Sequence, residues 1–145
     1  HSMNDLKSSI KEHSFGSVYV FPESETRHSF HYTIGFQQSF AQPEILIFGL
    51  SKEVGSQILW SIKEKLQAGE SLEPNRRLSG ILSRGLDVMF LPVIHPIKVE
   101  YLAVARQHYK EPFQALVMLW PDENNVLPNE PYSTNTSQIQ AFEIT

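Results

Sequence analysis

Two histidines lie in the stretch of this sequence whose residue types are best suited to acid–base chemistry. His28 and His31 lie three residues apart in a stretch that alternates apolar and polar side chains, so they point to opposite faces of a strand and cannot hold one metal ion together. His31 shares its face with Thr33 and Gly35, whose small size leaves room for a ligand. A neutral imidazole there could donate or accept a proton, which makes His31 the first catalytic candidate. A structural histidine with a backbone partner, and a bend at Gly35, are the alternatives.

Glu44 and Asp122 are the acidic candidates. Each follows a proline and each lies at an end of a predicted central strand, so we expect them to approach each other or His31. A carboxylate within reach of an imidazole is the minimum for general acid–base chemistry. The alternatives are a turn-capping role for Asp122, which the preceding proline favours, and a role for Glu44 as a charge that limits aggregation of the apolar strand.

Three arginines surround a predicted loop. Arg76, Arg77 and Arg84 could bind a phosphate or a partner's carboxylate, because guanidinium groups pair with both in bidentate fashion. Ion pairs with Glu70 and Glu73 on a solvated loop explain the same residues equally well.

Several chemistries find no support. The chain has no cysteine, and its histidines lack the spacing of a metal motif, so we expect no metal and no cofactor. Neither a nucleophile motif nor a glycine-rich phosphate loop is present. Trp120, at the end of a predicted strand, is either part of the core or an aromatic anchor for a partner.

Apolar periodicity predicts the elements that must position these residues. Phe30, Tyr32 and Ile34 alternate with polar residues, whereas Glu44 to Leu50 is apolar on both faces and is typical of a covered central strand. The pattern predicts strands at 17–21, 29–36, 44–50, 86–93 and 113–120, with a connection at 22–27, a polar loop between the second and third strands, and a loop at 70–84. It predicts helices at 4–13 and 97–109, and a third that has Ser51 as its N-cap and Gly69 just past its end. A close contact between helix and sheet would explain Gly55 in the middle helix. The fold class is therefore α+β, with a mostly antiparallel sheet of five to six strands and two main helices on one face.

Length and charge limit the organisation and the partners. The 145 residues predict one domain over 3–145, with His1 and Ser2 as an expression scar and a mobile tail at 132–145. The net charge of −4 argues against nucleic acid, and no apolar run is long enough to cross a membrane. We expect a cytoplasmic protein, in keeping with the absence of cysteine.

Three stretches carry a family resemblance: YTIGF, PEILIFGL and ALVMLWPDENNVLP. In this order and spacing they resemble an uncharacterised bacterial family, domain of unknown function 4262, from about Ile10 to Pro128. The family pattern commonly has a histidine before the Pro-Glu pair and a tryptophan after the late proline, where this chain has Gln42 and Asn129. The resemblance implies no activity, and these two departures would remove any activity that depends on the histidine or the tryptophan.

These features favour a small binding protein, an accessory or immunity-type factor that binds another protein through one sheet face and its polar loops. The alternative is a small-molecule-binding or hydrolytic enzyme with a pocket around His31, Thr33, Gly35 and Glu44. RNA binding through the arginine loop is a third hypothesis, which the acidic balance disfavours.

Overall fold

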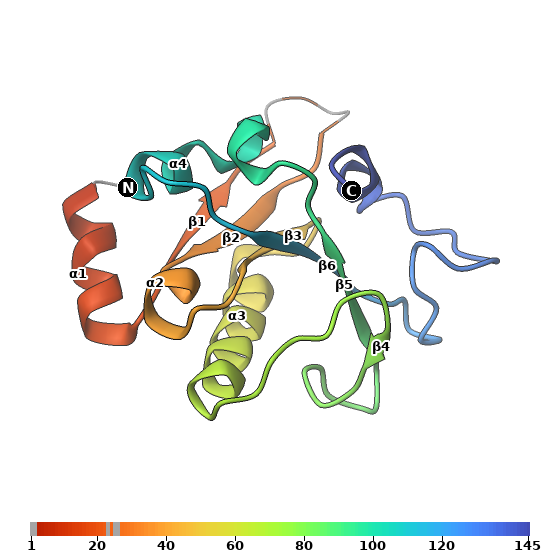
Figure 1. Cartoon of the computed structure of the whole chain (residues 1–145). Coiled ribbons are helices and arrows are strands. Elements are labelled where there is room, and N and C mark those ends of the chain that lie inside the picture. Colours follow the sequence, from red (N-terminus) through yellow and green to blue (C-terminus); the bar gives the residue numbers. More distant parts are fainter. Residues whose placement is uncertain (1–2, 23, 25–26) are drawn as a thin grey trace.

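A six-stranded mixed sheet forms the centre of the molecule, in the order β1-β2-β3-β6-β5-β4 (Figure 1). The computed structural model describes residues 3–22, 24 and 27–145. The strands are β1 (Gly16–Val20), β2 (Phe30–Ile34), β3 (Glu44–Phe48), β4 (Arg77–Leu78), β5 (Val88–Pro92) and β6 (Ala115–Leu119). The helices are α1 (Met3–His13), α2 (Phe36–Phe40), α3 (Lys52–Gln67) and α4 (Ala103–His108), with 3-10 turns η1 (Pro96–Lys98), η2 (Glu100–Leu102) and η3 (Ile139–Glu143). The predicted α+β class with a mostly antiparallel sheet is confirmed.

Helices cover both faces of the sheet, which differs from the prediction that both main helices lie on one face. Along β3, Ile45 and Ile47 pack in the core under α3, whereas Leu46 and Phe48 pack in the core under α4 and α1. All five residues of β3 are buried. A strand that is apolar on both faces needs a cover on each, so the two helices divide between the faces.

The strand β3 pairs in parallel with β6, and this pairing decides which loops meet. Glu44 lies opposite Ala115 at the start of both strands, and β2 runs antiparallel on the other side of β3. The chain reaches β6 only after α3, β4, β5 and α4, and such a crossover is the connection that parallel strands require. The two strands therefore begin at one end of the sheet and finish at the other.

The longest helix, α3, has the boundaries and caps expected from the sequence. The Ser51 hydroxyl accepts a hydrogen bond from the Val54 N–H at 3.2 Å, and Gly69 follows the helix with φ +89°. The contact inferred for Gly55 is confirmed, because a Cβ at this position would lie 2.3 Å from Nδ1 of His31. Gly55 thus allows α3 to approach β2 closely.

Three elements differ from the sequence pattern. The predicted helix at 97–109 is broken, because Val99 has extended backbone with φ −80° and ψ 118° between η1 and η2. The short helix α2 and the two-residue strand β4 lie in segments predicted as loops. Of the predicted connection at 22–27, residues 23, 25 and 26 lie outside the described residues, as do His1 and Ser2.

The C-terminal segment lies against the end of the sheet. The side chain of Gln138 is 1% exposed, accepts a hydrogen bond from the Trp120 N–H and donates one to the Trp120 carbonyl. Ala141 is buried in the core on the α4 side. None of the helices in the described part of the chain has the length and hydropathy needed to span a membrane.

Candidate functional site

Glu44 is a buried carboxylate enclosed by hydrogen-bond donors. Its residue is 1% exposed, and it begins β3 where α2 turns back over the end of β2. The donors are the Thr33 hydroxyl (2.8 Å), the Tyr109 hydroxyl (2.6 Å), and the N–H groups of Gly35 (3.2 Å), Phe36 (3.1 Å) and Gln37 (3.1 Å). Five donors on two oxygens match an ionised carboxylate, which accepts hydrogen bonds and donates none.

Gly35 makes this arrangement possible. Its φ of +124° turns the chain from β2 into α2, and a Cβ there would lie 2.8 Å from both the Ser14 carbonyl oxygen and Cα of Phe15. No other residue type adopts this conformation at so little cost, and none has the space. The room that the sequence suggested for a ligand at Gly35 is therefore occupied by the backbone of Ser14 and Phe15.

Burial raises the pKa of the Glu44 carboxyl, and the hydrogen bonds from Tyr109, Gln37, Thr33 and Phe36 oppose that rise. Burial together with the neighbouring Glu44 raises the pKa of the Tyr109 hydroxyl, which stays a donor. The enclosed carboxylate joins three parts of the chain through these hydrogen bonds: β2, α2 and Tyr109, which follows α4. The predicted aggregation-limiting role does not describe a side chain that is buried inside the protein.

His31 is packed between the sheet and α3. It is 3% exposed, its ring lies edge-on to Tyr19 at 4.7 Å between centroids, and Nδ1 faces Gly55. Burial, assisted by the charge of Lys52 and opposed by that of Glu53, lowers the pKa of His31 to about 4. The face predicted to form a pocket at His31 and Thr33 is thus filled by α3 and by the Glu44 carboxylate.

The lowered pKa of His31 predicts acid sensitivity. Between pH 6.5 and about 4 the unfolded chain binds a proton at this histidine and the folded chain does not, so stability falls as the pH is lowered through this window. A shift from 6.5 to about 4 corresponds to roughly 3 kcal/mol. Urea unfolding between pH 7 and 4 should show this loss in the wild type and not in His31→Gln. The exposed variant His95→Asn should keep it, and an unchanged slope in His31→Gln would refute the assignment.

Asp122 and Glu44 do not meet. Because β3 and β6 are parallel, Glu44 lies at the start of this pair of strands and Asp122 follows the end of β6. The expectation that they approach each other is therefore wrong. Oδ1 of Asp122 accepts hydrogen bonds from the N–H groups of Asn124 (2.8 Å) and Val126 (3.0 Å), which confirms the turn-capping alternative.

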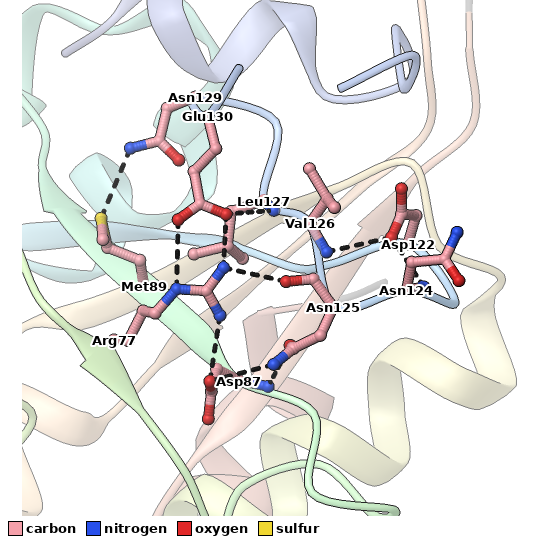
Figure 2. A network of polar contacts seen from close by, with 10 residues as sticks. All are labelled: Arg77, Asp87, Met89, Asp122, Asn124, Asn125, Val126, Leu127, Asn129 and Glu130. Carbon is pink, nitrogen blue, oxygen red and sulfur yellow. Dashed lines mark hydrogen bonds and ion pairs between the residues drawn. The ribbon is translucent and has the colours of Figure 1, made fainter. Parts of the chain in front are cut away.

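Arg77 is the centre of a second polar network (Figure 2). Its guanidinium pairs with both carboxylate oxygens of Glu130 and with Oδ2 of Asp87 at 3.0 Å, and donates to the Asn125 carbonyl at 2.8 Å. Asn125 closes the ring, since its Nδ2 lies 3.1 Å from Asp87 and its Oδ1 accepts the Asp87 N–H. The hydrogen bond from Arg77 lowers the pKa of the Glu130 carboxyl, and the same bond raises the pKa of Arg77, so Arg77 and Glu130 both stay charged. These partners occupy the guanidinium group in place of an external anion. The network fastens β4 to the loop after β6.

Three further residues predicted to bind a ligand or partner are Arg76, Arg84 and Trp120. Arg76 pairs with Glu73 at 3.0 Å on the surface, whereas Arg84 is exposed with a φ of +62°. Trp120 donates its indole N–H to the Phe48 carbonyl at 2.7 Å and is half-buried. Arg76 and Arg77 are thus each paired with carboxylates of the chain itself. Within the described ranges no three His, Asp or Glu side chains could hold a metal ion.

A cleft of about 370 Å³ lies on the α4 side of the sheet, and none of the residues described so far in this section lines it. Val18, Val20, Phe30 and Tyr32 of β1 and β2 line it, and the opposite wall comes from η2 and α4. We call it the β1–α4 cleft; among the described residues its lining is Val18, Val20, Phe21, Pro22, Arg27, His28, Phe30, Tyr32, Glu100, Tyr101, Ala103, Val104 and Gln140.

Hydrogen bonds hold the cleft walls in place. The Val104 N–H donates to the Tyr32 hydroxyl at 3.2 Å, which joins the first turn of α4 to β2, one of the two strands that form the floor of the cleft. At the other end, Arg27 donates to the Tyr101 hydroxyl at 2.6 Å and pairs with Glu143 at 2.9 Å. The cleft is thus an apolar hollow with a polar end, the composition typical of a recognition site.

A comparison with protein-family models matched residues 9–134 to the domain of unknown function DUF4262. The chain belongs to this family. The comparison with curated proteins and the comparison with solved structures each returned no match. The family assignment covers both polar networks and most of the β1–α4 cleft, so these features are parts of the DUF4262 domain.

The resemblance implies departures from the family pattern at Gln42 and Asn129, and these two residues lie in different places. Gln42 precedes β3 and lines a shallow surface hollow with Pro43, whereas Asn129 donates from Nδ2 to Sδ of Met89 at 3.5 Å in the Arg77 region. In this DUF4262 domain they therefore do not form one site. Sequence reasoning missed the β1–α4 cleft, for which the one available signal was the apolar Phe21 beside a polar connection.

Proposed function

We propose that this DUF4262 domain is a binding protein that recognises another protein through the β1–α4 cleft. The observation that carries the proposal is the contrast between this open apolar cleft and the buried state of His31, Thr33 and Glu44. A substrate cannot reach an acid–base pair that is enclosed by helices and backbone amides, whereas a partner's side chain can enter an open hollow. An accessory or immunity-type factor acts in this way, by occupying a surface rather than by turnover.

The cleft differs from the surface predicted from the sequence, which was one face of the sheet together with the polar loops. Because α3 covers one face of the sheet and α4 with α1 covers part of the other, a partner does not bind a whole sheet face in this proposal. The cleft lies where this cover ends, beside the edge strand β1. Its apolar floor favours an aliphatic or aromatic side chain of the partner, which is the kind of anchor that carries most of the energy in protein interfaces.

A pair of substitutions on α4 tests the proposal. Ala103 is exposed and lines the cleft, whereas Gln107 is exposed on the same helix and does not line it. Ala103→Arg should place a long charged side chain in the mouth of the cleft and weaken binding of the partner recovered from the native host by about tenfold or more. Gln107→Arg, which adds the same charge, should leave that affinity unchanged. Equal effects of the two variants, or none from Ala103→Arg, would refute the cleft as the binding surface.

A further inference from the structure

The outer edge of β1 is a pairing surface that no other described strand occupies. The strand β1 pairs with β2 alone, through five consecutive residue pairs without a bulge. At the other edge, β4 has only two residues and is fastened by the Arg77 network. Natural proteins protect exposed edges with charged residues, proline or bulges, because an open edge pairs with other strands. Gly16–Val20 contains no charged residue and no proline.

Phe21 is the most unusual side chain at this edge. It directly follows β1, it is 71% exposed, and its ring lies edge-on to Tyr19 at 4.8 Å between centroids. Helix α1 packs at the other end of the strand, where Leu6 lies 2.5 Å from the place a Cβ on Gly16 would take. Phe21 lies five positions after Gly16, which is about 16 Å in an extended strand. The Phe21 end of the strand is therefore well away from the contact with Leu6.

We propose that a second copy of this chain pairs antiparallel with this edge, on a two-fold axis at Val20. In this register Tyr19 of each copy lies opposite Phe21 of the other, and the two rings, which already contact each other within one chain, become cross-strand neighbours. Val20 lies opposite its own counterpart on the cleft face, and Val18 lies opposite Pro22, whose missing N–H is tolerated at the end of a ladder. The two sheets then become one continuous sheet.

The charges of the strand favour a second copy of the same chain as the occupant. Val18 to Pro22 is uncharged, so pairing the segment with itself brings no like charges together on the pairing line. The register also places two exposed phenylalanines against two half-buried tyrosines, and aromatic cross-strand pairs are among those that stabilise sheets. This interface goes beyond the proposed function, because it uses the edge backbone of β1. It shares Val18, Val20, Phe21 and Pro22 with the rim of the cleft and leaves Ala103 and the α4 wall free, so the Ala103→Arg test of the cleft does not alter it.

The molar mass in solution tests the proposal. Size-exclusion chromatography with light scattering over a concentration series should show a dimer of the full chain. Phe21→Glu places like charges near the axis and should raise the dimer dissociation constant by about tenfold or more. Tyr132→Glu, on a side chain that is 95% exposed elsewhere, should leave the dimer unchanged. A monomer at every concentration, or a dimer that Phe21→Glu does not weaken, would overturn the proposal.

Cysteine cross-linking tests the register. The chain contains no cysteine, so Val20→Cys introduces the only thiol, and the two-fold axis places it opposite its own counterpart within the Cα separation that a disulfide requires. Mild oxidation should convert this variant to a covalent dimer, whereas Tyr132→Cys should stay a monomer on denaturing gels. Equal cross-linking of both variants, or none at Val20→Cys, would contradict the two-fold axis at Val20. A cross-linked product with another protein would be distinguished by its mass.

Discussion

Glu44→Ala should destabilise the protein by about 3 to 5 kcal/mol, because it leaves buried donors without an acceptor. The Thr33 and Tyr109 hydroxyls and the N–H groups of α2 all point at this carboxylate. Domains of this kind are stable by only about 5–15 kcal/mol, so the variant should unfold at a much lower urea concentration than the wild type. Urea unfolding followed by circular dichroism at neutral pH measures the change.

Two further variants separate the charge from the space it occupies. Glu44→Gln keeps the size of the side chain but turns an NH₂ group toward donors, so it should also destabilise, by about 2 kcal/mol or more. Glu64→Ala removes an exposed carboxylate from α3 and should change stability by less than about 0.5 kcal/mol. A Glu44→Ala variant as stable as Glu64→Ala would contradict the structural role of the buried carboxylate.

Gly55→Ala should destabilise the protein by about 2 kcal/mol, although alanine is the better helix former. Replacing glycine in a helix gains about 1 kcal/mol from propensity alone. Here the added Cβ would lie 2.3 Å from Nδ1 and 3.0 Å from Cε1 of His31, a ring that is itself buried. Overpacking of a core commonly costs about 1–3 kcal/mol, and a contact this short lies at the upper end.

A double-mutant cycle checks the cause of that loss. In a His31→Ala background the ring is absent, so Gly55→Ala should become neutral or stabilising, with a coupling energy of about 2 kcal/mol between the two positions. Thermal unfolding of the four proteins supplies the measurement. If Gly55→Ala costs the same with and without the imidazole, then the contact between α3 and β2 is not the reason for the glycine.

The sequence predicted the strands well where their periodicity was clear. The alternation of Phe30, Tyr32 and Ile34 with His31 and Thr33 correctly assigned these residues to two faces. The two apolar faces of β3 also indicated cover on both sides, a requirement that the prediction of both helices on one face overlooked. Pattern within one segment is local information, and it does not say which segment supplies the cover.

The candidate site was predicted less well, because its contacts join residues far apart in the chain. Glu44 takes its donors from Thr33 of β2, from the residues that follow β2, and from Tyr109, 65 positions later. Arg77 finds Glu130 53 positions away. Which strands are parallel decides whether Glu44 and Asp122 meet, and strand order does not follow from residue type. Glu44, a polar residue beside an apolar strand, was therefore predicted as a catalytic group, whereas in the structure it is a buried acceptor of hydrogen bonds.

The most direct test of the central claim is site-specific photo-cross-linking at the β1–α4 cleft. A photoreactive residue at Ala103, with the same residue at Gln107 as a matched control, would be activated in the native host and the products analysed by mass. Binding through the cleft predicts a discrete adduct with one other protein at position 103 and none at position 107. Adducts of equal yield at both positions, or at position 107 alone, would contradict the cleft as the binding surface.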